Sequence, residues 1–491
     1  MTTSDPIFIL ARSLSQSEKR AFTRFAKLQT PASVNRYLAL FQRLAGMKTY
    51  NETLLKQEFG ARHFEQLKQQ LFKKIMQSLR LYHESGEDED RVALHLHNHR
   101  LLKNRDLPAW AEKELKRAAK IAGEATLHQY GQIIFHRQTE ATIASKNISM
   151  LRERISEHRA FMKKTVEEIV NEAGYLELFI EVDVINEQFE ATRNKAELQV
   201  IASFLKTPLL RDEQAALTVR AKILFHFIKG LALYLFCDFK SCAAHMGKVI
   251  GYFEKNPRML LQEEKLYVRS VANRSLGLFH CGLFAESKDL LAKLHAIPVR
   301  LPLNGEYRNH LACVLELMHL NRQKNFSRAV ALIEKNTALF AESGRPGAVS
   351  QQRTYNVFQQ ATAYRGAGNP KKASQIISSF INERGKGMKK DAYIMARILF
   401  MLLRFDLNDQ SLLESEIRSV QRFLKKENKL FLFEKKMLQF LNAMLTENST
   451  QQIRRNFQKL KKDLLELKKI AYERNAFMYY DFLDWVESFA R

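Results

Sequence analysis

Apolar residues recur at spacings of three and four along most of the chain, and short turns separate the segments that carry this pattern. Such spacing places the apolar side chains on one face of an α-helix. The segment from Phe64 to Tyr82 is an example, with Leu67, Leu71 and Ile75 on one stripe. The pattern predicts an all-α protein.

The segment Val357–Phe380 shows the pattern of two helices and one turn most clearly. Gly368 can close a first helix and Pro370 can open a second one, since glycine favours helix ends and proline favours helix starts. Small or aromatic residues stand where the two helices would touch: Ala361, Tyr364, Ala373, Ile377 and Phe380. We interpret this segment as a helical hairpin similar to a tetratricopeptide repeat.

Similar hairpins recur along the chain. The residues near the start of each presumed second helix are Ala111, Cys242, Ser287, Ala329, Ala373 and Leu413, and the last five are separated by 45, 42, 44 and 40 residues. Interpolation over the longer first gap places two further second helices near Ile155 and Leu198. A single hairpin cannot bury both of its faces, so neighbouring hairpins must stack. Residues 92–429 therefore predict a right-handed tetratricopeptide-like α-solenoid of about eight hairpins.

The two ends of the chain carry different patterns. Residues 1–84 predict a small basic helical bundle, in which Ser15 and Glu18 form a capping box at a helix start. Residues 85–91 are acidic and predict a solvated linker. Residues 430–491 predict C-terminal capping helices, one of which carries a single apolar stripe: Phe457, Leu460, Leu464, Leu467 and Ile470.

The charge of the chain is strongly positive, with a formal net charge of +25. Residues 1–83 hold 14 Lys and Arg against 5 Asp and Glu, a net of +9. Such a balance favours an acidic partner, either a protein segment or nucleic acid. The alternative is that long helices present Lys and Arg to water only for solubility.

Cysteine usage and hydropathy indicate a cytoplasmic protein that does not enter the membrane. The four cysteines, Cys237, Cys242, Cys281 and Cys313, lie in apolar helical stretches without a CxxC pair, and we expect small core residues of a reducing compartment. The N-terminus lacks the pattern of a secretory signal. The most apolar run, from Ile223 to Phe236, is shorter than a membrane span and is interrupted by His226 and Lys229.

No stretch of the sequence carries a convincing catalytic, cofactor-binding or metal-binding motif. The nearest candidate for a metal site is the run of His95, His97 and His99. On a helix, His95 and His99 share a face, but His97 points about 200 degrees away. We therefore expect structural histidines and a protein that is not an enzyme and holds no cofactor.

The inner wall of the predicted solenoid is where we expect a ligand. Alignment of the clearest hairpins on their turns places seven residues on this wall: Arg269, Phe279, His280, Asn321, Arg322, Tyr355 and Arg365. Guanidinium groups beside aromatic rings can bind carboxylates in a bidentate manner. These residues predict a groove for an acidic protein or peptide segment. An error of one residue in the alignment would instead distribute them over other helix faces.

Several segments resemble a family of uncharacterised bacterial helical-repeat proteins. They are LSQSEKRAFTRFAKLQ near the start, QSLRLYH from Gln77, TPLL from Thr207, RAKILF from Arg220, ARILFMLLRFDLND from Ala396 and ESEIRSVQRFLKK from Glu414. The resemblance implies one continuous architecture of bundle and solenoid, and it implies no activity or catalytic residues. The units depart from the tetratricopeptide motif at Lys229, Arg274 and Gln360, where a large apolar residue is usual.

These observations lead to two hypotheses of function. The first is a non-enzymatic interaction scaffold that binds an acidic protein or peptide segment in the solenoid groove. The second is a nucleic-acid-binding or transcriptional regulatory protein in which the basic bundle contacts phosphate, and its binding should weaken steeply with salt.

Overall fold

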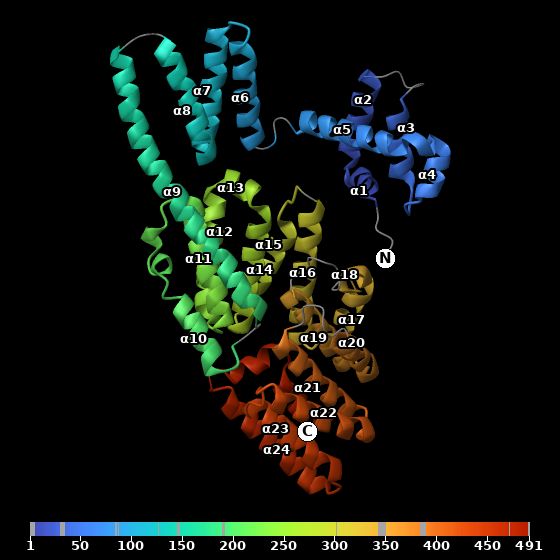
Figure 1. Cartoon of the computed structure of the whole chain (residues 1–491). Coiled ribbons are helices and arrows are strands. Elements are labelled where there is room, and N and C mark those ends of the chain that lie inside the picture. The colour runs from blue at the N-terminus through green and yellow to red at the C-terminus, as the bar shows by residue number, and fades with distance from the viewer. Residues whose placement is uncertain are drawn as a thin grey trace. The chain divides into compact units, whose positions relative to one another are not determined.

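The computed structural model describes residues 5–29, 35–83, 86, 88–125, 127–144, 148–188, 192–300, 302–341, 350–382, 389–470 and 472–489 (Figure 1). Within these ranges the chain forms helices joined by turns and no strand, which confirms the all-α prediction. None of the described helices is both long and apolar enough to cross a bilayer. The chain divides into two compact units, unit 1 (Met1–Thr165) and unit 2 (Val166–Arg491), which are described separately.

Unit 1 begins with a bundle of short helices. They are α1 (Pro6–Ser13), α2 (Gln16–Gln29), α3 (Arg36–Gly46), α4 (Glu52–Phe59) and α5 (Phe64–Tyr82). Phe22 and Phe41 meet in its core with ring centroids 4.5 Å apart. The predicted capping box is present at the start of α2. The Ser15 amide donates to Glu18 Oε2 at 2.7 Å, and the Glu18 amide donates to Ser15 Oγ at 3.2 Å.

The second part of unit 1 consists of α6 (Asp88–Lys103), α7 (Pro108–Glu124), α8 (His128–Ala144) and the first half of α9 (Ile148–Gln188). The expected linker at residues 85–91 lies partly outside the described residues. Asp88, Glu89 and Asp90, which we placed in this linker, form the first turn of α6 instead. Acidic side chains are stabilised at this position because the backbone N–H groups at a helix N-terminus carry partial positive charge.

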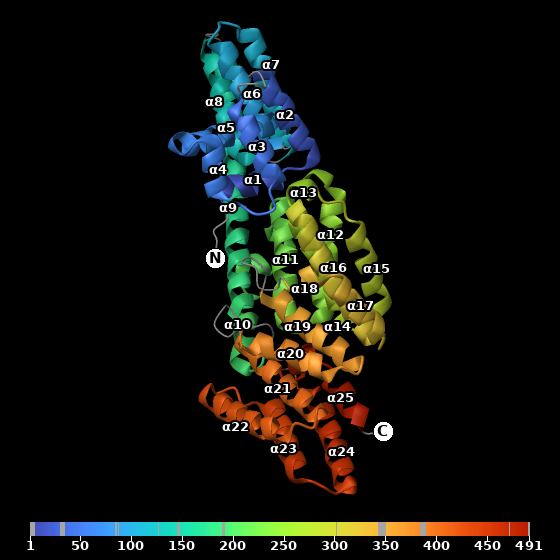
Figure 2. The same cartoon turned by 90° about the vertical axis from the view of Figure 1, so that its right-hand side faces the viewer.

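Unit 2 continues with the second half of α9 and a series of helix pairs. Its helices are α10 (Lys195–Phe204), α11 (Val219–Leu235), α12 (Phe239–Lys255), α13 (Pro257–Gln262), α14 (Glu264–His280), α15 (Phe284–Ala296), α16 (Pro302–Arg322), α17 (Phe326–Lys335), α18 (Thr337–Ala341), α19 (Ser350–Gly366), α20 (Pro370–Asn382), α21 (Lys390–Asp406), α22 (Gln410–Lys426), α23 (Leu432–Thr446), α24 (Thr450–Leu467) and α25 (Phe482–Phe489). From α11 onwards each pair packs internally and against the next pair along the chain. Figure 2 shows the C-terminal half of α9 beside α11, where Phe179 contacts Phe227 with ring centroids 5.6 Å apart.

A common turn closes the first helix of the recurring pairs. A residue with positive φ stands in each of these turns: Asp106, Cys237, Gly282, Lys324, Gly368 and Asn408. The amide of the next residue donates to the carbonyl five positions earlier at 2.8–3.1 Å, as in a Schellman motif. The residue five positions after each positive φ is buried against the partner helix. These buried residues are Ala111, Cys242, Ser287, Ala329, Ala373 and Leu413, which are the positions from which the period was found.

The two interpolated positions both lie near the start of a helix, but these helices depart from the regular pairs. Ile155 lies inside α9, which runs for 41 residues without a turn, and Leu198 lies in the ten-residue helix α10. Gly174, in the interior of α9, does not break this helix. A Cβ atom at Gly174 would lie 2.9 Å from Leu209 Cδ1, so the glycine allows a close approach of neighbouring chain segments. Spacing alone placed both positions early in a helix, but it did not predict the length of α9.

The C-terminal segment packs against distant parts of unit 2. The predicted stripe on α24 is confirmed, since Phe457, Leu460, Leu464 and Leu467 are buried. After α24, however, the chain returns to earlier helices through the 3-10 turn Arg474–Met478. The C-terminal segment that contains this turn and α25 makes two such contacts. Asn475 Nδ2 lies 3.1 Å from Thr192 Oγ1, and Asp484 Oδ1 lies 2.5 Å from Lys324 Nζ. This segment therefore does more than cover the last helix pair.

Arg193 anchors this arrangement from the segment between α9 and α10. Its side chain is fully buried, and Nη2 lies 2.8 Å from Glu434 Oε1 and 3.8 Å from Glu473 Oε2. Glu473 in turn accepts hydrogen bonds from the amides of Leu432 and Phe433 at the start of α23, at 2.9 and 3.1 Å. Although burial disfavours charge, the neighbouring carboxylates hold the pKa of Arg193 above its usual value.

Replacement of Arg193 by Met should destabilise unit 2 by about 3–5 kcal/mol, because it leaves the carboxylates of Glu434 and Glu473 buried without a cation. Trp485 is one of the chain's two tryptophans and is buried in unit 2. In a Trp110→Phe background, Trp485 fluorescence during urea unfolding would therefore report the stability of this unit.

Arg418→Met is the matched control, because it breaks the exposed pair with Glu414. It should cost less than about 1 kcal/mol. Equal losses of stability for Arg193→Met and Arg418→Met would contradict the role assigned to the buried cluster.

Candidate functional site

Unit 2 contains a recess formed by the first helices of four consecutive pairs. These helices are α11, α14, α16 and α19, and the recess is lined by Leu231, Tyr234, Arg269, Ala272, Asn273, Leu276, Tyr307, Leu311, Val314, Leu315, Met318 and Tyr355. Most of the wall is aliphatic, and the polar groups are one guanidinium, one amide and three phenols. A mostly apolar wall with a few polar groups is typical of a site that binds an apolar group in a fixed orientation.

Two tyrosines join the outer helices of this recess. The hydroxyls of Tyr234 on α11 and Tyr355 on α19 share a hydrogen bond, although the residues are 121 positions apart in the chain. Burial, together with the neighbouring Tyr355, raises the pKa of Tyr234 well above its usual value, so its hydroxyl keeps its proton at neutral pH. The pair fixes two walls of the recess relative to each other.

Arg269 is the positively charged group of the recess. Its guanidinium lies over the Phe227 ring, 5.0 Å from the centroid, and Nη2 donates to Asp183 Oδ1 on α9 at 3.0 Å. About one fifth of the side chain is exposed. A guanidinium has five N–H donors, so contact with Asp183 leaves donor capacity for a further carboxylate.

The structure brings two of the predicted site residues, Arg269 and Tyr355, into this recess. Phe279 and His280 lie near it as packing residues. The His280 ring stacks on Phe239 with centroids 4.6 Å apart, and Phe279 meets the edge of His319 at 5.1 Å. Burial lowers the pKa of His280 to about 4, so His280 supplies no positive charge to a ligand at neutral pH.

The other predicted arginines contact carboxylates of unit 2 itself. Arg365 Nε donates to Asp406 Oδ2 at 2.6 Å, and its Nη2 donates to Ser488 Oγ at 3.1 Å. Arg322 Nη1 lies 3.7 Å from Asp481 Oδ2. Asp406 ends α21 and Asp481 belongs to the C-terminal segment, so the chain itself supplies an acidic partner for each of these two arginines.

Asn321 also serves the packing of helix pairs. It is buried, and its Nδ2 donates to the carbonyl oxygen and to Oε1 of Gln359 on α19, both at 2.9 Å. It does not line the recess. The side-chain amide of Asn321 therefore links α16 to α19 by hydrogen bonds within the protein.

Sequence analysis missed Tyr234, Asn273 and Tyr307 in the recess. Asn273 follows Arg269 by four residues and so shares its helix face, a signal that could have been used. No sequence spacing relates Tyr234 or Tyr307 to Arg269, because they lie on other helices and reach the recess only through the packing of the helix pairs.

The histidine run His95, His97 and His99 does not assemble a metal site. His95 Nδ1 lies 2.8 Å from Glu114 Oε2, and His99 Nδ1 lies 2.9 Å from the Ala111 carbonyl oxygen, so both stabilise the α6–α7 pair. Within the described ranges, no group of three or more His, Cys, Asp or Glu residues could hold a metal ion.

Three of the four cysteines are buried as predicted. They are Cys237, Cys242 and Cys313, and burial raises the pKa of the Cys237 thiol to about 12. Cys281 is exposed, which corrects the prediction of a core position. It follows the last residue of α14, where the chain turns outward between two helices.

A second polar cluster lies between α11 and α12. His226 Nδ1 lies 2.8 Å from His245 Nδ1, and His226 Nε2 lies 3.1 Å from Glu213 Oε2. Hydrogen bonds from Tyr252 and Lys248 lower the pKa of Glu213 to about 2. Burial, aided by neighbouring cationic groups, lowers the pKa of His245 to about 4. A hydrogen bond between the two Nδ1 atoms requires a proton on one of them and a lone pair on the other, so protonation of both the His226 and His245 rings is disfavoured.

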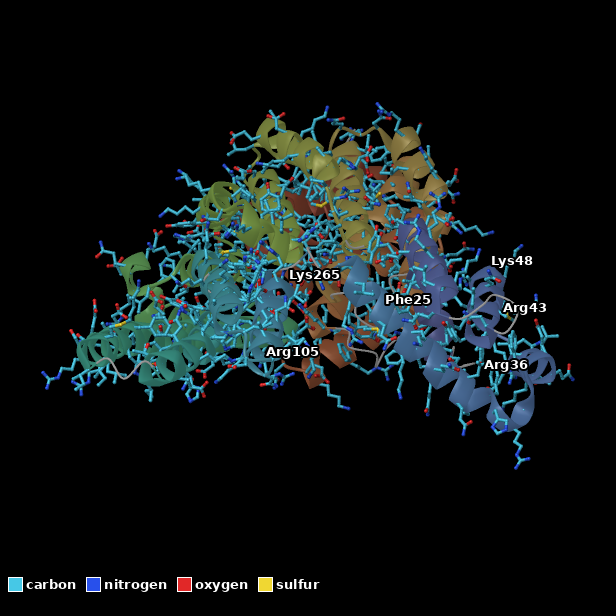
Figure 3. The ribbon with its side chains drawn as sticks, turned by 90° about the horizontal axis from the view of Figure 1, so that it is seen from above. Phe25, Arg36, Arg43, Lys48, Arg105 and Lys265 are labelled. Carbon is cyan, nitrogen blue, oxygen red and sulfur yellow. The ribbon has the colours of Figure 1, made fainter. Side chains whose placement is uncertain are left out.

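The basic bundle of unit 1 is a third candidate surface. Its five carboxylates all have a side-chain partner within the bundle. Four are in ion pairs, Asp5 with Lys68, Glu52 with Lys56, Glu58 with Arg43, and Glu65 with Lys68, and Glu18 Oε1 lies 2.8 Å from His83 Nε2. Most of the 14 Lys and Arg therefore have no carboxylate partner among the described residues of the bundle. Figure 3 shows two of these cations, Arg36 on α3 and Lys48 in the segment after it.

The cations on α2 form the most regular part of this surface. Arg20, Arg24 and Lys27 are exposed at positions i, i+4 and i+7 of one helix face. Leu28 beside them is 83% exposed. A helix face of this kind can follow a row of phosphates.

Comparisons of the chain with family models, with curated proteins and with solved structures find no match in any of the three.

The stability of unit 2 should fall as the pH is lowered from 7 to 5. An unfolded histidine takes up a proton near pH 6.5, whereas folded His245 does so only at about 4. Between these values the unfolded state binds more protons, so the free energy of unfolding decreases as the pH falls. His245→Gln should reduce the slope of the free energy of unfolding against pH by up to about the contribution of one bound proton.

Urea titrations at pH 7.5, 6.0 and 5.0, again followed by Trp485 fluorescence, would measure this effect. His280→Gln offers an independent comparison, because burial also lowers the pKa of His280 to about 4. The same pH dependence in the His245→Gln variant and in the unmodified protein would contradict the assignment.

Proposed function

We propose that this protein is a cytoplasmic, non-enzymatic interaction scaffold whose helix pairs form a right-handed tetratricopeptide-like α-solenoid. The resemblance of the Val357–Phe380 hairpin to that repeat agrees with this proposal. The recurring turn with positive φ and the buried residue five positions later support it, because they give successive pairs the same internal geometry. Stacking of such pairs is the physical basis of a solenoid.

The recess on α11, α14, α16 and α19 is the single observation that carries the proposed binding function. In a solenoid of this type the first helices of the pairs line the inner wall, and the recess is formed by first helices alone. Its residues come from four pairs, so no isolated pair contains the site. A ligand bound there would contact the array as a whole.

The chemistry of the recess selects a peptide segment in which a large apolar side chain lies next to a carboxylate. The aliphatic residues of α16, among them Leu311, Val314 and Met318, provide an apolar wall. Arg269 offers charge-assisted hydrogen bonds to the carboxylate, which are stronger than those between neutral groups. Because Asp183 already binds Arg269, the ligand carboxylate would share or displace an internal one.

When an unbiased library of displayed peptides is selected for binding to the full chain, peptides with an acidic residue beside a large apolar residue should be enriched. Arg269→Gln should weaken binding of the selected peptide about tenfold, the loss expected for one hydrogen bond to a charged group. Fluorescence anisotropy with the labelled peptide would measure the dissociation constant.

Arg322→Gln is the matched control for this experiment. Arg322 also lies over a phenylalanine ring, at 5.1 Å from the Phe284 centroid, and also faces an aspartate, but it does not line the recess. Its replacement should leave peptide affinity unchanged. Equal losses for both variants, or enrichment of peptides without acidic residues, would overturn the proposed ligand class.

We keep nucleic acid binding by the basic bundle as a second candidate function, because its carboxylates are all internally paired while many of its cations have no carboxylate partner. This hypothesis includes a transcriptional regulatory role in which α2 contacts phosphate. Electrostatic contact with phosphate releases counterions, so affinity would fall linearly on a logarithmic salt scale.

Binding of a labelled DNA duplex at about 50 mM salt tests this second candidate. The triple variant Arg20→Gln, Arg24→Gln, Lys27→Gln should lower affinity and should reduce the salt slope by about 0.9 for each phosphate that the protein no longer neutralises.

A triple variant of equal charge on α22 is the control: Arg422→Gln, Lys425→Gln and Lys426→Gln, all of which replace exposed residues. Equal effects of the two triple variants would show that DNA binding depends on the net charge of the chain and not on the face of α2. Absence of binding by the unmodified protein would remove the candidate.

A further inference from the structure

The C-terminal half of α9 is apolar on two opposite faces. One face is buried in unit 2 through Tyr175, Leu178, Val182 and Ile185. The opposite face carries a second stripe at spacings of three and four: Val166, Ile169, Ala173, Leu176, Ile180 and Val184. All six residues are exposed, and the five larger side chains are between 39% and 63% exposed.

This outer stripe has the form of a helix-packing seam. Alternating spacings of three and four residues are those at which one helix meets another along its length. At about 1.5 Å per residue, the stripe from Val166 to Val184 extends for about 27 Å. A continuous exposed apolar surface of this kind marks an interaction site.

A shallow recess lies on the same stripe. It is lined by Phe179, Ile180, Asp183, Val184, Glu187 and Gln188. The half-buried ring of Phe179 forms its apolar side, and carboxylates lie at its edge. A single apolar side chain from a partner helix can enter here between Ile180 and Val184.

The charged residues of this part of α9 are all acidic. Between Val166 and Gln188 the sequence holds seven Asp and Glu and no Lys, Arg or His, in a chain whose net charge is +25. Glu177 and Glu181 are exposed one turn apart beside the stripe. Nucleic acid and anionic membrane are therefore disfavoured at this surface.

The same charge argues against a pair of α9 helices from two copies of the chain. Such a pair would place the acidic flanks of both seams in proximity, and flanking charges of like sign disfavour helix pairing. A helix with Lys and Arg beside its apolar stripe would instead meet opposite charge on the flank.

We propose that the outer face of α9 docks a basic amphipathic helix of a partner protein. Its apolar stripe lies on the seam from Val166 to Val184, and its Lys and Arg residues face Glu177 and Glu181. This surface and the recess at Arg269 are lined by different residues, although Asp183 at the edge of the α9 surface accepts a hydrogen bond from Arg269. Variants on the apolar stripe test the α9 surface separately.

The test uses two synthetic helical peptides with the same leucine stripe at spacings of three and four. One peptide carries lysine beside the stripe and the other carries glutamate. The full chain should bind the lysine peptide and not the glutamate peptide in fluorescence anisotropy. Ile180→Ser with Val184→Ser should raise the dissociation constant of the lysine peptide at least tenfold.

Two further variants isolate the apolar and the charged contributions. Leu412→Ser with Leu465→Ser removes two leucines that are each 45% exposed elsewhere in unit 2, and it should leave the affinity unchanged. Glu177→Gln with Glu181→Gln should weaken binding and flatten its salt dependence. Arg269→Gln removes the partner of Asp183 at the edge of the shallow recess, so it should not weaken binding of the lysine peptide, whereas it should weaken binding of the acidic peptide at the recess in unit 2. Failure of this proposal and failure of the recess proposal are therefore distinguishable.

Three results would overturn the proposal. Equal affinity for the two peptides would remove the charge argument, and unchanged affinity after Ile180→Ser with Val184→Ser would remove the seam. Sedimentation that shows a dimer of the unmodified chain, and a monomer of the same double variant, would assign the surface to a second copy instead.

Discussion

The buried charge cluster around Arg193 is the constraint on which the arrangement of unit 2 depends. A guanidinium removed from water requires carboxylates beside it, and Glu434 and Glu473 come from segments more than 200 residues further along the chain. Glu473 also occupies the amides at the start of α23, so one side chain joins a distant cation to a helix N-terminus. Glu473 joins the cluster only when the C-terminal segment is in place, which makes this segment part of the core.

This constraint explains why two arginines chosen as ligand contacts are used internally. Arg322 and Arg365 stand at the ends of first helices, where the returning C-terminal segment passes. Both arginines face carboxylates of the chain itself, Asp481 and Asp406. What remains for an external ligand is the part of the first-helix wall that this segment does not contact, and Arg269 with its aliphatic neighbours lies there.

Three surfaces of different chemistry are thus separated along the chain. The bundle of α1–α5 has an excess of cations because its carboxylates are paired internally. The recess in unit 2 combines an apolar wall with one oriented guanidinium, and the outer face of α9 combines an apolar seam with acidic flanks. Under the proposals made above, each surface would bind a partner of different charge.

The sequence by itself determined the local structure. Periodicity gave the helices, turn residues such as Gly368 and Pro370 gave the hairpins, and small buried residues such as Ala373 gave their period, because each of these depends on contacts between near neighbours in the chain. Tertiary structure alone decided the length of α9, where Gly174 serves close packing, and the recess, whose walls come from four helix pairs. It also decided the partners of Arg193, since a buried ion pair depends on distances in space that sequence spacing does not encode.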